Sequence, residues 1–156
     1  MIGIAFTGSG KTLSFSLPLL MFALEEESKL SFEKGEGPVG MIVCPSVSGS
    51  LRGRDVSESD KRELARQTHD GLLQMSQALH EDGCPLIRSL LCIGGISMAE
   101  QNEVMQKGYH IIVATPGRLM DMLERGKVML SSCKQVNIYL HMHKLMPLKI
   151  SVPRRS

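Results

Sequence analysis

The chain has 156 residues, of which 42% are hydrophobic, and this suffices for one domain with its own core but not for two of ordinary size. Its formal net charge is only +2, and few prolines interrupt it, so the composition is that of a globular protein. No apolar run reaches the roughly eighteen residues of a membrane-spanning helix, so we expect no contact with a membrane.

The first half of the chain alternates short apolar runs with an amphipathic stretch. Residues 1–5 (MIGIA) predict a buried strand before a glycine-rich segment. The spacing of Leu and Phe over residues 11–27 predicts a helix, and Pro18 predicts a kink within it. A second apolar run predicts a strand over residues 39–45. Residues 47–61 are rich in Ser, Gly and charge without any apolar period, which predicts a surface loop.

The second half continues the alternation. Periodic spacing predicts helices, and apolar runs predict strands, in the order helix 62–82, strand 86–95, helix 97–108, strand 110–116 and helix 117–126. Capping boxes predict the starts of the first two of these helices, at Asp60 with Glu63 and at Ser97 with Glu100. Strands that alternate with helices predict an α/β fold, a mostly parallel sheet with helices on both faces.

A candidate phosphate-binding loop lies between the first predicted strand and helix. Its sequence, AFTGSGKT, resembles the template G-x-x-x-x-G-K-[ST], although Ala5 replaces the first glycine. Gly8 and Gly10 allow the backbone to approach a phosphate closely, Lys11 is the type of residue that reaches the β- and γ-phosphates, and Thr12 offers a hydroxyl to Mg²⁺. The plainer alternative is a glycine turn before a helix that begins with Lys. The candidate nucleotide-binding residues are Ala5, Phe6, Thr7, Gly8, Ser9, Gly10, Lys11 and Thr12.

Three further stretches follow in a fixed order. RELARQT opens the helix at 62–68, a glycine pair follows a strand at 94–95, and ATPGRL follows another strand at 114–119. Together with AFTGSGKT they resemble motifs I and Ia, the glycine doublet and motif Ib of the first RecA-like P-loop NTPase domain of DEAD-box ATP-dependent RNA helicases. In amino-acid sequence these stretches are most similar to the Abstrakt type, a nuclear helicase linked to pre-mRNA splicing. The resemblance covers residues 1–46 and 62–134.

The resemblance implies two ligands, ATP with Mg²⁺ and RNA. Motif I holds ATP in this family, whereas the other motifs hold the RNA sugar-phosphate backbone without sequence preference. It also implies a nuclear, otherwise intracellular, location and spliceosomal proteins among the partners. The RNA-binding residues that it implies are Pro45, Ser46, Arg62, Glu63, Gly94, Gly95, Thr115, Pro116, Gly117 and Arg118.

The residue types at these positions fit that role independently. Contacts to phosphates that do not depend on the base sequence are made by hydroxyls, by backbone N–H groups at helix starts and by arginines. All three segments also follow predicted strands, where open α/β sheets bind their ligands. Plainer interpretations exist for the glycine pair and for ATPGRL. Gly94–Gly95 is also a simple turn, Thr115–Pro116 is also an N-cap followed by Pro at the first helical position, and Arg118 is also a solvated surface charge.

The sequence departs from the family after Cys133. The family's motif II, Asp-Glu-Ala-Asp, follows a fifth strand there, but residues 134–156 contain five basic residues and no acidic one. No other predicted strand ends in a carboxylate. Because P-loop NTPases hold Mg²⁺ with a strand-end Asp, we expect a sheet without its carboxylate-bearing strand and no catalytic residue in this chain. We therefore expect no ATP hydrolysis and no RNA unwinding by this chain alone, in which we also expect no second RecA-like domain.

These observations predict a partial N-terminal RecA-like domain over residues 1–134, interrupted by an insertion at 47–61 and followed by a divergent tail at 135–156. Intron or out-of-frame sequence would explain the insertion and the tail. One hypothesis is an incomplete piece of an RNA helicase that binds ATP. The alternative is a non-catalytic ATP- and RNA-binding module, or a truncated isoform that competes with the complete helicase. A small P-loop kinase fits worse, since RELARQT and ATPGRL have no place in one.

Overall fold

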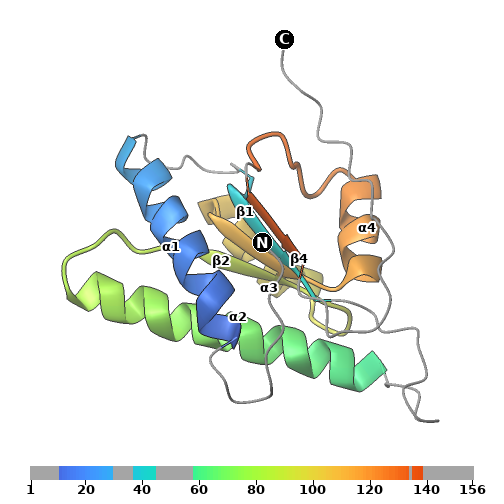
Figure 1. Ribbon diagram of the computed structural model, residues 1–156. Helices are drawn as coiled ribbons and strands as arrows, with labels where there is room; N and C mark the ends of the chain where they lie inside the picture. Colours follow the sequence, from blue (N-terminus) through green and yellow to red (C-terminus); the bar gives the residue numbers. More distant parts are fainter. Residues whose placement is uncertain (1–10, 30–36, 45–57, 134, 139–156) are drawn as a thin grey trace.

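A computed structural model of the chain describes residues 11–29, 37–44, 58–133 and 135–138. Helices and strands alternate along it, as predicted (Figure 1). The elements in order are α1 (Lys11–Lys29), β1 (Gly40–Val43), α2 (Glu58–Glu81), β2 (Ser89–Cys92), α3 (Met98–Lys107), β3 (Ile111–Ala114), α4 (Pro116–Glu124) and β4 (Gln135–Ile138). None of the helices in these ranges combines the length and the apolar character that crossing a membrane requires.

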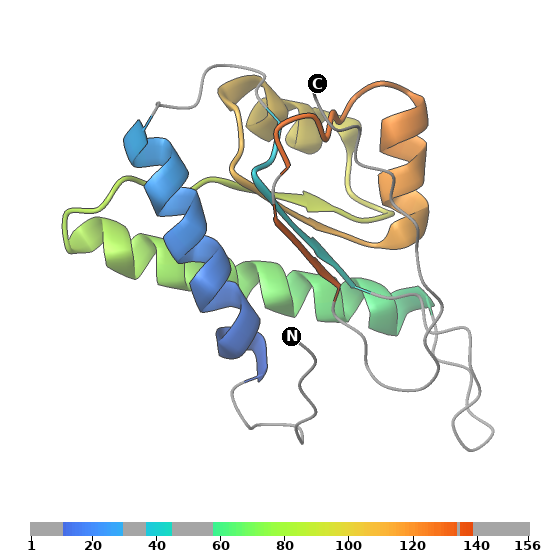
Figure 2. The same ribbon diagram turned by 45° about the horizontal axis from the view of Figure 1, so that its top comes forward.

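The four strands form one parallel sheet in the order β2-β3-β1-β4. The register places Ser89 and Gly40 on either side of Ile111, and Gln135 on the outer side of Gly40. Because all strands run the same way, their carboxyl ends meet at one edge of the sheet, which we call the carboxyl edge (Figure 2). This is the edge at which open α/β sheets bind their ligands.

Helices cover both faces of the sheet, which confirms the predicted fold class. Leu19, Leu20 and Ala23 of α1 join Ala65 and Leu72 of α2 in one core layer with Ile42, Ile111 and Val113 of the strands. The other layer joins Leu119 and Met122 of α4 to the opposite strand faces, Met41, Val43, Leu90, Ile112 and Ala114, with Val104 and Met105 of α3 packed against it. Every residue of β1 and β3 is buried, as both faces are covered, and this explains their unbroken apolar sequences.

The predicted ends of α3 are confirmed. The Ser97 hydroxyl accepts a hydrogen bond from the Glu100 backbone N–H at 3.3 Å, so Ser97 is the N-cap. Gly108 closes the helix with a positive φ of 77°, and its N–H donates to the Met105 carbonyl. The first helix, α1, is not ended by its proline: it continues through Pro18 to Lys29.

The predicted start of α2 is wrong. The helix begins at Glu58, so Asp60 lies inside it and is not its N-cap. The last four residues of the predicted loop at 47–61 are therefore helical. Glu and Lys favour a helix, and no Gly or Pro interrupts residues 58–61, so nothing stops the helix from extending backwards into this charged stretch.

The expectation that the sheet lacks a strand after Cys133 is also wrong. Residues Gln135–Ile138 form β4, which pairs in parallel with β1. Val and Ile favour extended structure, and the edge of β1 offers them unpaired backbone groups. The predicted strand over residues 1–5 lies outside the described residues.

Candidate functional site

All four helices begin at the carboxyl edge of the sheet. α3 and α4 each follow directly from the carboxyl end of a strand. For α1 the direction follows from its other end, because Glu27 hydrogen-bonds His110, the residue just before β3, at 2.9 Å. The last turn of α1 is thus at the amino edge, and Lys11 is at the opposite, carboxyl-edge end of the helix (Figures 1 and 2). Backbone N–H groups at four helix starts favour negative charge here.

The first turn of α1 fits a phosphate group. Lys11 is the first residue of the helix and Thr12 the second, and the first turn contains no acidic residue. A carboxylate there would repel an anion, whereas the exposed N–H groups of a helix start attract one. The preceding residues of the candidate loop, Ala5–Gly10, lie outside the described residues.

The structure brings the predicted motif Ia helix to the glycine doublet. A Cβ atom placed on Gly94 would lie 3.9 Å from the Arg62 guanidinium carbon, and one on Gly95 would lie 3.1 Å from Arg62 Nη1. Gly95 has a positive φ of 81°, so the pair is a turn that requires glycine at its second position. Glu63 is exposed next to Arg62 and accepts a hydrogen bond from Gln67 at 3.1 Å. Pro45 and Ser46 lie outside the described residues.

The start of α4 has the predicted cap arrangement. Thr115 is the N-cap and Pro116 occupies the first helical position, but the Thr115 hydroxyl makes no capping hydrogen bond. Thr115 is buried and Gly117 is exposed. The Thr115 N–H donates a hydrogen bond to the Cys92 carbonyl at 3.1 Å, and Cys92 is the last residue of β2. The start of α4 therefore lies at the carboxyl edge beside the end of β2.

Arg118 is not a solvated surface charge. Only 19% of its side chain is exposed, and its Nη1 lies 2.8 Å from Asp121 Oδ2 in an ion pair. Its Nη2 donates to Gln101 Oε1 on α3 at 2.9 Å. The arginine is therefore fixed by side chains from two helices, α3 and α4.

Gln101 and Asp121 organise this site, and the sequence reasoning missed both. Gln101 is 2% exposed and also donates to the Leu91 carbonyl at 3.1 Å, so it connects α3 to β2 as well as to α4. Its position offered a signal. Gln101 occupies the same helical stripe as Val104, Met105 and Gly108, and a polar residue on a buried stripe must have partners.

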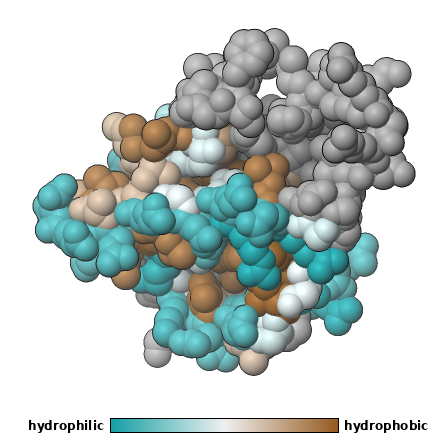
Figure 3. All heavy atoms as spheres, turned by 90° about the horizontal axis from the view of Figure 1, so that it is seen from below, coloured by the Kyte–Doolittle hydropathy of each residue, from teal (hydrophilic) through white to brown (hydrophobic). Residues whose placement is uncertain are grey.

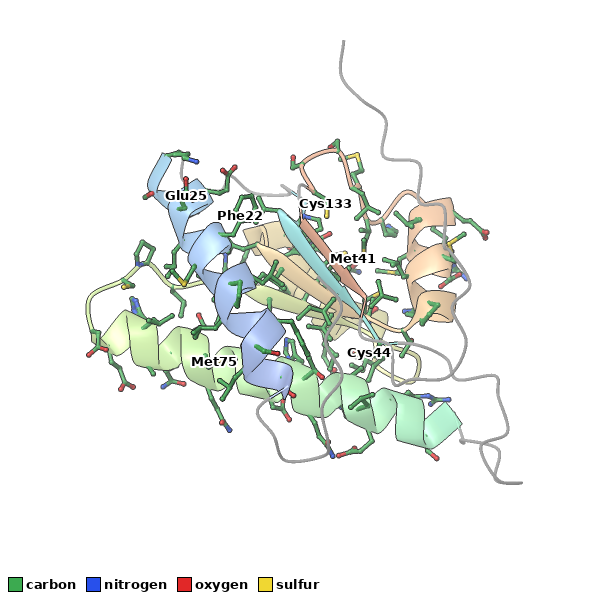
Figure 4. All side chains as sticks on the ribbon, viewed as in Figure 1. Phe22, Glu25, Met41, Cys44, Met75 and Cys133 are labelled. Atoms are coloured by element: carbon green, nitrogen blue, oxygen red, sulfur yellow. The ribbon has the colours of Figure 1, made fainter. Side chains whose placement is uncertain are left out.

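The cysteines at the carboxyl edge are neutral thiols. Cys44 directly follows β1 (Figure 4), and burial raises its pKa to about 11 against a smaller lowering by Thr68. Burial likewise raises the pKa of Cys92 to about 11. Neither side chain is a thiolate at neutral pH, and the four cysteines form no disulfide.

Carboxylates are absent from the strand ends in the described part of the carboxyl edge. The residues that directly follow β1, β2 and β3 are Cys44, Ile93 and Thr115, and none of these three is a carboxylate. Among the described residues there is no cluster of three or more metal-ligating side chains. Asp121, the acid nearest to the start of α4, is held by both Arg118 and Arg125.

The family model of the DEAD/DEAH box helicases matches residues 1–139 of the chain. Among individual proteins, DEAD-box ATP-dependent RNA helicase 35 of Arabidopsis thaliana is 52% identical over 138 residues, which is 88% of this chain and 21% of that protein. ATP-dependent RNA helicase abstrakt of Drosophila melanogaster is 50% identical over 134 residues, or 86% of this chain and 19% of that protein. The chain thus spans about a fifth of these relatives.

Solved structures share the fold. The yeast DEAD-box splicing factor Prp28 superposes with a TM-score of 0.66 at 26% identity, over 87% of this chain and 27% of that chain. The RNA helicase Prp28 from Chaetomium thermophilum, bound to ADP, superposes with a TM-score of 0.63 at 34% identity and the same coverage. The chain thus shares its fold with a part of each of these two helicases.

Proposed function

Since the chain belongs to the DEAD/DEAH box helicase family and is a partial helicase domain, we propose that it binds ATP through residues Ala5–Thr12. The start of α1 supports this proposal, because its first turn lies at the carboxyl edge and carries no acidic side chain. The solved relative that is bound to ADP supports the choice of nucleotide. Lys11 would contact the terminal phosphates, and Thr12 alone would offer a hydroxyl to Mg²⁺.

The second part of the proposal is that the same edge contacts the RNA backbone. One observation carries it: the starts of α2 and α4 and the glycine doublet are far apart in sequence but meet around the end of β2. Backbone N–H groups and arginines at one edge suit phosphates of any sequence. The residues proposed for these contacts are Pro45, Ser46, Arg62, Glu63, Gly94, Gly95, Thr115, Pro116, Gly117 and Arg118.

We further propose that these 156 residues do not hydrolyse ATP or unwind RNA by themselves. No carboxylate follows a described strand, and the sequence has no acidic residue after Glu124. A P-loop enzyme needs such a group to hold Mg²⁺ and to orient the attacking water. β4 supplies the strand at the expected place but is followed by Tyr139 and Leu140 instead of acids.

A second candidate function uses the same residues differently. A chain that binds ATP and RNA without turnover would compete with a complete helicase for both ligands. Relatives named as a splicing factor and as a pre-mRNA-processing helicase support a nuclear location and spliceosomal partners in either case. The proposed partial domain is interrupted by the insertion within residues 47–61. It was predicted to end at residue 134, but β4 pairs with β1 and the family match extends to residue 139, so we place residues 135–138 in the domain and the divergent tail after them.

ATP binding is tested by the dissociation constant of the purified chain for ATP. Lys11→Ala removes the lysine of the phosphate loop, and we expect affinity to fall at least about tenfold, or about 1.4 kcal/mol. Lys29→Ala makes the same change at the far end of α1, about 27 Å away at 1.5 Å per residue, and should leave the affinity unchanged. Equal losses in the two variants, or no binding by the unaltered chain, would contradict the proposal.

The competitor hypothesis has its own test. Adding the chain in excess to a complete DEAD-box helicase should slow duplex unwinding, and Lys11→Ala should slow it less. An unwinding rate that does not change at any chain concentration would remove this alternative and leave the binding proposal in place.

A further inference from the structure

We propose that Gln101 is a positioning residue for RNA binding, because it holds Arg118 in a fixed relation to the Gly94–Gly95 turn. The inference rests on the proposed RNA-binding function of the carboxyl edge. It adds a residue that lies in none of the motifs and that does not itself face the ligand.

The contacts of Gln101 connect three elements. From α3, its Nε2 donates to the Leu91 carbonyl at 3.1 Å and to the Ile93 carbonyl at 3.5 Å, and Ile93 is the residue directly before Gly94. Its Oε1 accepts from Arg118 Nη2 of α4 at 2.9 Å. One side chain thus bridges the end of β2, where the glycine turn begins, and the first turn of α4.

The chemistry of the bridge requires an amide. Its β2 partners are carbonyls, which only accept hydrogen bonds, and its α4 partner is a guanidinium, which only donates. The side chain must therefore donate at one end and accept at the other, and the same requirement fixes which end carries the nitrogen. Glutamate would keep the oxygen for Arg118 but would face the carbonyls with a second oxygen, and methionine would fill the space without either hydrogen bond.

The environment makes the bridge rigid. Gln101 is 2% exposed, and an amide buried to this degree cannot replace lost partners with water. Asp121 holds the guanidinium from a second side, at Nη1, and Arg62 packs against the glycine turn from α2. The turn and the arginine are thereby set at a fixed spacing before any ligand arrives.

Fixed spacing matters for a sequence-blind site. Successive phosphates on one RNA strand are separated by a set distance, so donors that contact neighbouring phosphates must be separated to match. Loss of the Gln101 bridge would leave the turn and Arg118 in place individually but would let their separation vary. The consequence falls on RNA affinity and not on the start of α1, where ATP is proposed to bind.

The test compares Gln101→Met with Gln106→Met, the same substitution at an exposed position of α3. For the 156-residue chain we expect Gln101→Met to weaken binding of single-stranded RNA about tenfold and to leave ATP affinity within about twofold. Gln106→Met should change neither. In an Arg118→Ala background, Gln101→Met should weaken RNA binding by less than about twofold, because the residue acts through Arg118.

The outcomes separate this inference from the function it rests on. If the unaltered chain binds RNA and Gln101→Met binds equally well, or if the losses are fully additive with Arg118→Ala, the inference is wrong and the function stands. If the unaltered chain binds no RNA, both fall. Should Gln101→Met fail to fold by circular dichroism, Gln101→Glu takes its place. It keeps the length and an oxygen for Arg118, and the same selective loss of RNA affinity is expected.

Discussion

At the scale of single residues, His110 shows how a buried polar group is satisfied in this fold. The ring is fully buried, and its Nδ1 accepts a hydrogen bond from the Arg88 backbone N–H at 3.0 Å. The proton must therefore lie on Nε2, which donates to Glu27 at 2.9 Å. This neutral tautomer ties the last turns of α1 to the start of β3.

The unfolding free energy should fall as the medium becomes acidic. Burial lowers the pKa of His110 and of His69 in the folded chain, despite the opposing effects of Glu27 and Asp70. Between those lowered pKa values and about 6.5, the unfolded chain binds protons that the folded chain does not. The contribution of these two neutral histidines to the unfolding free energy is complete above about pH 6.5 and declines below it. Urea unfolding at about pH 7.5 and about pH 5.5 would measure the difference. Higher stability at the lower pH would contradict this, and His110→Gln should reduce the difference.

The glycine doublet offers a matched pair of substitutions. Gly95→Ala forces a side chain into a positive φ and to 3.1 Å from Arg62, so we expect a loss of about 1 kcal/mol in unfolding free energy and weaker RNA binding. Gly94→Ala meets only ordinary contacts at 3.9 Å and should cost less than about 0.5 kcal/mol. Urea titrations of both variants measure the difference, and equal costs would show that the turn does not need its second glycine.

At the scale of secondary-structure elements, α2 has two adjacent leucines, of which one faces the core and the other faces solvent. Leu72 is 1% exposed and packs in the α1–α2 core layer, whereas Leu73 is 43% exposed. We expect Leu72→Ala to lower the unfolding free energy by about 2–5 kcal/mol and Leu73→Ala by less than about 0.5 kcal/mol. Similar losses in chemical denaturation would contradict the described orientation of α2.

The face of the molecule seen in Figure 3 is mixed, with hydrophobic side chains exposed among hydrophilic ones.

The elements themselves were predictable where local chemistry is unambiguous. The capping box and glycine stop placed α3 within one residue of its observed ends, and the apolar runs located β1, β2 and β3. The start of α2 was missed because a polar, charged stretch has no hydrophobic period, yet it extends a helix easily. β4 was missed because four residues of mixed polarity become a strand only when a sheet edge is available to pair with them.

At the scale of the whole molecule, the sequence motifs located the pieces of the site but not their connections. Glycines, hydroxyls and arginines at strand ends are visible in the sequence, and the parallel topology then brings them to one edge. That Arg62 lies against Gly95 and Arg118 against Gln101 depends on the packing of α2 and α3 on opposite faces of the sheet. Local sequence spacing carries no information on such contacts.

Also at the scale of the whole molecule, we propose that the chain has a nucleotide site but lacks the acidic group that ATP hydrolysis needs. Phosphate release from ATP by the purified chain, in the presence of Mg²⁺ and single-stranded RNA, tests it most directly. We predict release no faster than that of the Lys11→Ala variant, with or without RNA. RNA-stimulated release that Lys11→Ala abolishes would contradict the claim, since it would require a carboxylate pair that the described strand ends do not contain.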